Sequence, residues 1–246
     1  MTANDFLFGV VPYVVTALAI VVTIVRWRKA PFTVSSLSSQ LLESRKLYWG
    51  SISFHWGLSI ILVGHLLALI VPSGFELWNG APLRLYLLEA TGLALGLWAA
   101  FGVTVLIIRR HSSARVRRVT TPMDTVVLVV IAIQILTGVW MAVGYRWGSY
   151  WGTSVFVPYM RSLFQFQPDV AYVSPLPLVL KLHVLSFFTF LAVFPFSRLV
   201  HIITLPLQYF FRPWQKVIAN RDQPSAGFVS NDPRISTGRH SSTSNS

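Results

Sequence analysis

The sequence predicts an all-α integral membrane protein, a bundle of five transmembrane helices. Its 246 residues are 54% hydrophobic and only 11% charged, whereas a soluble globular chain carries about 25% charged residues. So few charges do not cover a water-facing surface, and we therefore expect lipid around the chain. Five stretches are also long enough to cross a hydrocarbon core, which takes about 20 apolar residues. They lie near 6–25, 47–71, 86–108, 124–143 and 178–205.

The five stretches differ in the ionisable residues that they contain. The first, third and fourth are almost uncharged, which is ordinary for a transmembrane helix. The second and the fifth carry ionisable side chains, which are costly against lipid and usually face the interior of a bundle. These residues are His55 and His65 in the second stretch and Lys181, His183, Arg198 and His201 in the fifth.

The connecting segments predict the orientation, because cytoplasmic loops carry an excess of Lys and Arg. The segments 26–46 and 109–123 and the tail after 206 each hold five basic residues, whereas the two opposite loops together hold only Arg84, Arg146 and Arg161. We therefore predict an N-terminus outside and a C-terminus in the cytoplasm. The same pattern explains the net charge of +12 without a nucleic-acid partner, which would need a solvated basic face.

The remaining segments complete the domain organisation. The loop 144–177 is rich in aromatic residues, which favour the membrane–water boundary, and we expect it on the outer surface and partly helical. Residues 1–217 are predicted to form one membrane domain. Residues 218–246 are rich in Ser, Asn, Pro and Gly and are predicted to be a disordered cytoplasmic tail. Cysteine is absent, which excludes thiolate and iron–sulfur ligation by this chain.

Two histidines on each of two predicted helices indicate bis-histidine haem ligation. One buried histidine is readily explained by an interhelical hydrogen bond, but two pairs on two helices are not. Antiparallel helices match His55 with His201 toward the cytoplasm and His65 with His183 toward the outside. The sequence thus predicts two haem b groups, one near each membrane surface, with these four histidines as iron ligands.

The spacing along the two helices supports this pairing only in part. His183 and His201 are 18 residues apart, which places them on one face of a straight helix and about 27 Å apart. His55 and His65 are ten residues apart, or about 15 Å. Tilt of the helices, or a kink at Pro195 between the two ligands of the fifth stretch, would absorb the mismatch. Gly57 and Gly64 are expected to leave room for a flat macrocycle.

Arg198 lies one helical turn before His201. Its ordinary role would be a snorkelling anchor at the cytoplasmic surface. We expect it instead to pair with a haem propionate, because the guanidinium fork suits a carboxylate.

Several long blocks resemble the gamma subunit of respiratory nitrate reductase, a membrane cytochrome b. The similarity covers about residues 35–217 and is strongest in SSQLLESR (38–45), FHWGLSIILVGH (54–65), ARVRRVTTPMD (114–124), KLHVLSFFTFLAVFPFSRLVH (181–201) and the LPLQY that follows. The family's four haem ligands fall on His55, His65, His183 and His201, with the pairing given above.

This resemblance implies a subunit of the prokaryotic cytoplasmic membrane that oxidises quinol near the outer haem. Electrons would pass inward through both haems to an iron–sulfur beta subunit and a molybdenum alpha subunit, where nitrate becomes nitrite. The chain would therefore not reduce nitrate alone.

The segment that follows the second stretch departs from the family pattern. The family has a quinol-binding lysine between the second and third helices, whereas PLRLYLLE (82–89) has none and is shortened. Arg84 and Tyr86, together with His65, are the residues expected at the quinol site.

Three other interpretations remain open from the sequence. A related dihaem cytochrome that passes electrons to a sulfite- or heterodisulfide-reducing complex would show the same sequence features, because the acceptor chemistry belongs to the partner. Electron flow in reverse, from nitrite, depends only on relative potentials. A haem-free anchor or a transporter that moves protons through buried histidines would need acidic partners in the membrane, for which the spans offer only Glu89 and Asp124.

Overall fold

The structure of this chain, a computed structural model, describes residues 2–29 and 45–199, and these residues are predominantly helical. Five helices within them are long and apolar enough to cross a membrane, which confirms the predicted fold class. Their bounds are Asp5–Lys29, Tyr48–Ile70, Pro82–Ser112, Pro122–Gly144 and Leu178–Phe196. The first four agree with the predicted stretches to within a few residues at each end.

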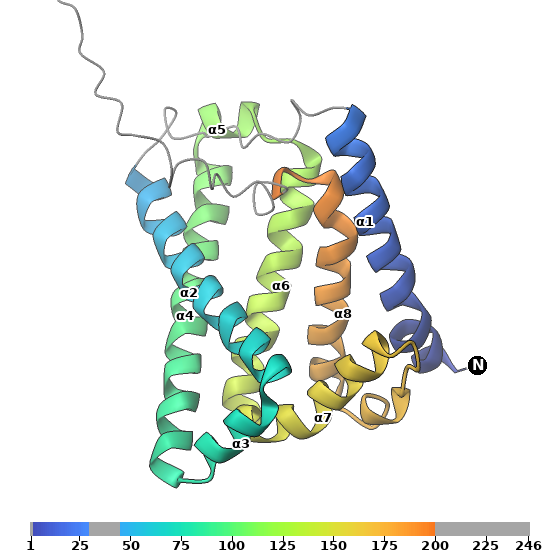
Figure 1. Ribbon diagram of the computed structural model, residues 1–246. Coiled ribbons are helices and arrows are strands. Elements are labelled where there is room, and N and C mark those ends of the chain that lie inside the picture. The colour runs from blue at the N-terminus through green and yellow to red at the C-terminus, as the bar shows by residue number, and fades with distance from the viewer. Residues whose placement is uncertain (1, 30–44, 200–246) are drawn as a thin grey trace, which may run out of the picture. The chain divides into compact units, whose positions relative to one another are not determined.

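The elements follow one another along the chain without any strand in the part that the structure describes (Figure 1). They are η1 (Asp5–Val10), α1 (Val11–Lys29), α2 (Arg45–Ile70), α3 (Pro72–Asn79), α4 (Pro82–Ser112), α5 (Ala114–Arg118), α6 (Pro122–Gly144), α7 (Gly148–Phe164), η3 (Val170–Tyr172), α8 (Leu178–Val193) and η4 (Phe194–Phe196).

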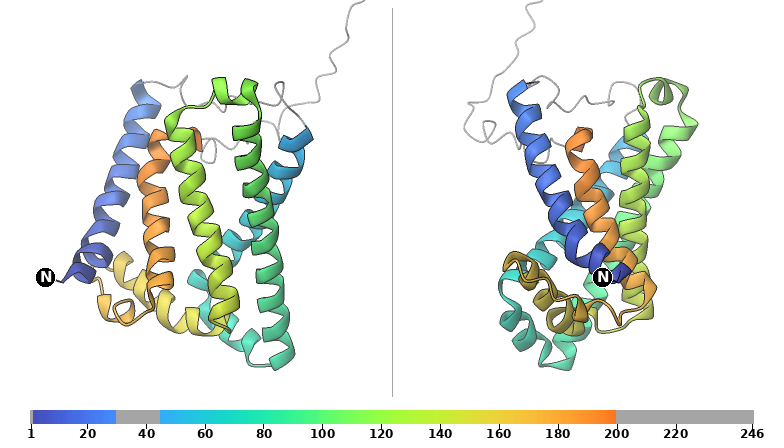
Figure 2. Two further views of the ribbon diagram at one scale, coloured as in Figure 1. Left: turned by 180° about the vertical axis from the view of Figure 1, so that it is seen from behind. Right: turned by 90° about the vertical axis from the view of Figure 1, so that its right-hand side faces the viewer.

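The long helices pack in a row rather than around a common axis. α2 packs on α4, α4 on α6, α6 on α8, and α8 on α1. Figure 2 shows the same order from behind, with α1 and α8 side by side. The histidine-bearing helices α2 and α8 therefore lie on either side of the pair α4 and α6.

Proline and side-chain caps set several helix ends. Pro72, Pro82 and Pro122 stand in the first turns of α3, α4 and α6, where a missing N–H costs nothing. At the start of α6 the Thr121 hydroxyl accepts a hydrogen bond from Asp124 N, and the Asp124 carboxylate accepts one from Thr121 N. This reciprocal capping box satisfies two donors that the helix leaves free.

The last helix ends earlier than predicted. α8 stops at Val193, and Phe194–Phe196 form a single 3₁₀ turn that contains Pro195. Ser197 then adopts an extended backbone. Arg26 of α1 donates hydrogen bonds to Pro195 O and Ser197 O, both at 2.8 Å. Within the described residues the predicted stretch 178–205 is therefore not one continuous helix. It breaks at Pro195, where a kink was predicted, because a proline removes a helical hydrogen bond and clashes with the preceding turn.

Glycines bring α2 and α4 into close contact. A Cβ on Gly102 of α4 would lie 2.8 Å from Gly50 O, and one on Gly57 of α2 would lie 2.8 Å from Leu95 O. The expectation that Gly57 leaves room for a macrocycle is therefore wrong, since it packs against the backbone of α4. Gly64, in contrast, has no atom within 4 Å of an added Cβ and does border open space.

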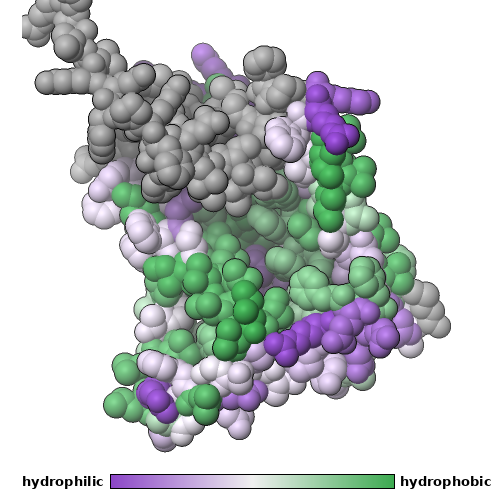
Figure 3. Space-filling view, viewed as in Figure 1, coloured by the Kyte–Doolittle hydropathy of each residue, from purple (hydrophilic) through white to green (hydrophobic). Residues whose placement is uncertain are grey.

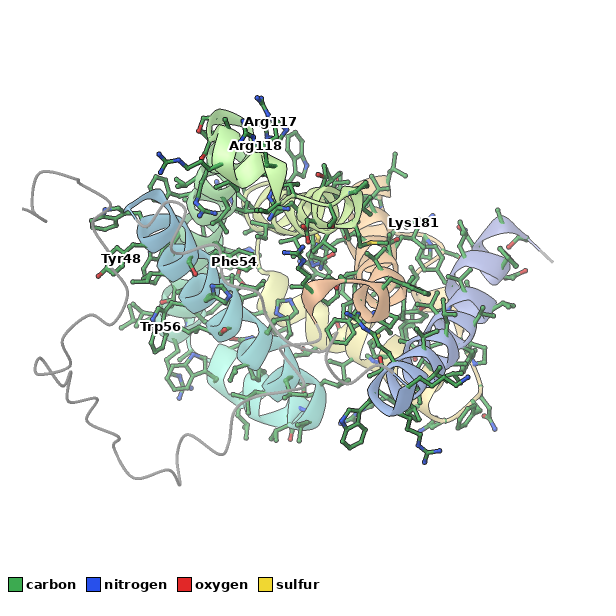
Figure 4. The ribbon with its side chains drawn as sticks, turned by 90° about the horizontal axis from the view of Figure 1, so that it is seen from above. Tyr48, Phe54, Trp56, Arg117, Arg118 and Lys181 are labelled. Atoms are coloured by element: carbon green, nitrogen blue, oxygen red, sulfur yellow. The ribbon has the colours of Figure 1, made fainter. Side chains whose placement is uncertain are left out.

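Basic residues gather at the end of the bundle where α5 lies. α1 ends with Arg26, Arg28 and Lys29, and α5 is Ala-Arg-Val-Arg-Arg. Figure 4 looks onto this end and shows Arg117 and Arg118 on the outer side of α5. In the same view Tyr48 and Trp56 point away from the bundle, whereas Phe54 of α2 faces inward, in accord with its burial against α4.

α7 lies at the opposite end and confirms that the aromatic loop 144–177 is partly helical. Its Tyr159 is fully buried and donates a hydrogen bond to Phe8 O at 2.8 Å. Burial raises the pKa of the Tyr159 phenol. Tyr13 of α1 donates in turn to Leu163 O at 2.9 Å. These contacts tie α7 to the start of the chain.

Candidate functional site

The two histidines of α2 are exposed on the surface of the described chain and hold the same orientation. Nδ1 of His55 lies 2.7 Å from Ser51 O, and Nδ1 of His65 lies 2.8 Å from Ile61 O. A carbonyl oxygen only accepts, so each Nδ1 carries the proton and donates it. The Nε2 lone pair of each neutral ring is therefore available to a metal. His111 makes the same contact with Ile107 O, so this orientation alone does not mark a ligand.

His183 of α8 is half-buried against α6. Its Nδ1 lies 2.9 Å from the Thr137 hydroxyl oxygen, and its Nε2 lies 3.1 Å from the Gln134 amide nitrogen. Gly138 provides the space for the ring, since an added Cβ would lie 3.2 Å from His183 Cε1. Sequence reasoning identified His183 and missed all three α6 residues. A polar Gln–x–x–Thr pair in an otherwise apolar helix was the signal.

His65 of α2 and His183 of α8 lie within range of an electrostatic interaction. Their pairing on one iron stays a prediction. Figure 3 shows a recess between α2 and α1 on this face, with mainly apolar visible walls. His201, the predicted partner of His55, lies outside the described residues.

Arg198 is paired with a carboxylate of the protein. Its Nε lies 3.6 Å from Asp124 Oδ1, and Arg110 Nη1 lies 3.8 Å from Asp124 Oδ2. Arg198 therefore links the end of the last described segment to the start of α6. Its expected contact with a propionate stays a prediction.

Arg84 and Tyr86 hold neighbouring helices onto the start of α4. The Arg84 guanidinium lies over the Trp78 ring at 5.6 Å and donates to Leu77 O at 3.1 Å. The Tyr86 ring meets the Trp147 ring edge to face, with centroids 4.9 Å apart. Both side chains thus have structural contacts with α3 or with the residue before α7. Beside them an apolar groove of about 260 Å³ runs between the end of α2, α3 and α4.

Comparison with known proteins identifies the family. A family model described as nitrate reductase gamma subunit matches residues 4–220. The chain belongs to the nitrate reductase gamma subunit family. It is 31% identical to the nitrate reductase gamma chain of Bacillus subtilis over 217 residues, which cover 86% of this chain and 96% of that one.

Two further relatives match most of this chain, one over nearly its whole length and the other over a third of it. The chain is 28% identical to the respiratory nitrate reductase 1 gamma chain of Escherichia coli over 220 residues, covering 88% and 97% of the two chains. It is 32% identical over 216 residues to the nitrate reductase-like protein NarX of Mycobacterium tuberculosis, where the match covers 33% of that protein. The chain is thus a multi-pass membrane subunit of a prokaryotic nitrate reductase.

Glu89 and Asp124, the two acidic residues of the predicted spans, have partners other than histidine. Glu89 accepts hydrogen bonds from Ser149 N at 2.7 Å and from the Ser149 hydroxyl at 2.6 Å. Asp124 pairs with two arginines and caps α6. Among residues 2–29 and 45–199, no three His, Asp, Glu or Cys side chains gather into a metal-binding group. The available donors are separate imidazoles, which suit a cofactor held by two axial ligands.

Proposed function

We propose that this gamma subunit holds two haem b groups and passes electrons from quinol to its partner subunits. His65 and His183 would bind the outer haem iron, and His55 and His201 the inner one. The proposal rests on the orientation of His55 and His65, each of which directs Nδ1–H to a carbonyl of α2, and on the electrostatic interaction of His65 with His183 of α8. The b haems supply one-electron transfer across the membrane.

The chemistry of the donors supports this assignment. A low-spin haem needs two neutral imidazoles, each free of a proton on the ligating nitrogen. His55 and His65 direct Nδ1–H to a carbonyl of their own helix and so leave Nε2 unprotonated. The open surroundings of Gly64, one residue before His65, favour a bulky group at that point of α2.

The proposed orientation of the two haem sites in the membrane follows from the distribution of charge. The basic residues of α1 and α5 lie at one end of the bundle, and the positive-inside rule assigns that end to the cytoplasm. His183 lies near the start of α8 and His65 near the end of α2, both toward the opposite, outer end. Quinol oxidised there would release two protons outside and send two electrons inward.

The quinol site is proposed near His65, with the residues Arg84 and Tyr86 at its edge. Arg84 is engaged with Leu77 and Trp78, so its contribution would be to hold α3 in place beside the quinol. The apolar groove between α2, α3 and α4 offers a surface for a quinol ring or its tail. The electrons would continue to an iron–sulfur beta subunit and a molybdenum alpha subunit.

A haem assay on the full chain tests the proposal. A pyridine haemochrome spectrum is expected to give two haem b per chain, both reduced on addition of quinol. His183→Ala and His55→Ala should each lose one haem. His111→Ala is the matched control, because His111 has the same hydrogen bond to its helix and should keep both. Absence of haem, or equal haem content in all variants, would overturn the assignment.

A further inference from the structure

Three groups on α6 surround the imidazole of His183. The Thr137 hydroxyl meets Nδ1, the Gln134 amide meets Nε2, and Gly138 leaves space beside Cε1. The other two described histidines of the proposed haem sites are instead oriented by a carbonyl of their own helix. His183 is therefore the one of these three whose ring is held by a neighbouring helix.

The hydrogen bonds of Thr137 define the direction of this contact. Its hydroxyl donates to Ile133 O at 2.7 Å, so its single proton is already used. The oxygen is left to accept, and the partner at 2.9 Å is His183 Nδ1. Nδ1 of His183 therefore carries the proton, and Nε2 of the neutral ring is an acceptor. The Gln134 amide nitrogen, at 3.1 Å from Nε2, is a donor in agreement with this tautomer.

The position of Gln134 is held from α8 itself. The Ser186 hydroxyl faces two acceptors, the Gln134 amide oxygen and His183 O, the latter at 3.0 Å. The contact with the amide oxygen turns the amide nitrogen of Gln134 toward His183. Ser186 lies one turn after His183 and is buried. The chain of contacts from Ser186 through Gln134 and His183 to Thr137 thus links α8 and α6 with one consistent set of donors and acceptors.

We infer that Thr137 is a positioning residue for His183: it accepts Nδ1–H, directs Nε2 toward the iron of the outer haem and raises the basicity of this one ligand. The inference rests on the proposed function. Outer partners of a metal-bound histidine fix the ring and its tautomer and strengthen it as a donor. A more basic ligand stabilises the oxidised iron, so the Thr137 contact lowers the potential of one haem and leaves the other unchanged.

Gln134 has a different part in the same site. Its amide occupies the position at Nε2 that the iron would take, so it must turn aside when the haem binds. Thr137 contacts the opposite nitrogen and is compatible with ligation throughout. Substitutions of the two residues are therefore expected to differ in effect. Only Thr137 is expected to change the haem potential through His183.

The test is a redox titration of the full chain carrying Thr137→Val, followed by optical spectra and low-temperature electron paramagnetic resonance. We expect the midpoint potential of one haem to move to a more positive value and its low-spin signal to shift, with two haems per chain retained. Thr137→Ser keeps the hydroxyl and should restore both properties. Thr189→Val is the matched control, because Thr189 of α8 is exposed and bonds to Leu185 O.

The outcomes separate this inference from the proposed function. Two haems with unchanged potentials and signals in Thr137→Val would refute the role of Thr137 and leave haem binding intact. Equal shifts in both haems, or the same shift in Thr189→Val, would also refute it. If Thr137→Val does not assemble, Thr137→Ala replaces it: a more positive potential of one haem supports the role of Thr137, and unchanged potentials overturn it. Absence of haem in the unsubstituted chain would refute the proposed function itself.

Discussion

The packing of α2 on α4 is predicted to depend on the absence of a side chain at Gly102. A methyl group there would lie 2.8 Å from Gly50 O and 2.8 Å from Phe54 Cα. These are backbone atoms, so no rotamer change relieves the contact. Gly102→Ala therefore requires the two helices to move apart.

The size of the effect follows from the distances. Carbon atoms pack best at about 3.5–4.0 Å, so the helices must separate by about 1 Å at this point. Forced insertion of one methyl group into a packed interior costs about 1–3 kcal/mol. The cost matters more here than in water, because helix association in a membrane depends on close packing rather than on the hydrophobic effect. Removing a glycine from a helix offsets up to about 1 kcal/mol.

Gly92→Ala provides the comparison on the same helix. A Cβ on Gly92 meets nothing within 4 Å, so this substitution should be neutral or stabilise the helix by up to about 1 kcal/mol. The assay is the free energy of unfolding in mixed micelles, measured for both variants and for the unsubstituted chain. We expect Gly102→Ala to be less stable than Gly92→Ala by about 1–3 kcal/mol. Equal stabilities would refute the close packing of α2 on α4.

Three further substitutions test the ends of the bundle by the same assay. Arg26→Gln removes charge-assisted hydrogen bonds to two carbonyls after α8 and should lower the free energy of unfolding by about 2–4 kcal/mol. Arg28→Gln is the control, because Arg28 is exposed and its loss should change stability little. Equal losses of stability in the two variants would contradict the contact of Arg26. Tyr159→Phe leaves Phe8 O without its buried donor and should cost about 1–3 kcal/mol. The raised pKa of Tyr159 means that the unfolded chain ionises first, so stability should fall as pH rises above about 10 in the unsubstituted chain and less in Tyr159→Phe. Asp124→Asn should lower the free energy of unfolding by about 1 kcal/mol, and this loss should become smaller in high salt, which screens the ion pairs. A loss of stability that does not change with salt would argue against the ion pairs of Asp124.

Local features of the sequence predicted most of the fold. Hydropathy over about 20 residues decides whether a segment spans the membrane, and this property does not depend on the neighbours of the helix. The five spans and the histidines on α2 and α8 could therefore be identified before the structure. The contacts between helices could not. Gly57 packs on α4 instead of flanking a cofactor, because which face meets which helix is set by the whole bundle.

The site shows the same division between local and distant information. His65 and His183 could be paired from the direction of their helices; the structure puts the two imidazoles within range of an electrostatic interaction, and the pairing itself stays a prediction. Thr137 and Gln134 escaped notice, since nothing in the sequence of α8 indicates that α6 lies against His183. The contacts of Arg84 could not be predicted from the sequence either. Its position in the chain favoured a place in the quinol site, whereas its observed contacts are with Leu77 and Trp78.

The end of α8 bears on the mismatch in spacing between the two histidine-bearing helices. A continuous helix from His183 would place residue 201 about 27 Å away, against about 15 Å between His55 and His65. In the structure the α-helix after His183 continues only to Val193, ten residues or about 15 Å. The 3₁₀ turn at Pro195 and the extended Ser197 follow it. Hence the 18 residues from His183 to His201 are not five turns of one straight helix, because the chain changes conformation at Pro195, where the sequence predicted a kink. His201 lies outside the described residues, so its distance from His183 stays a prediction.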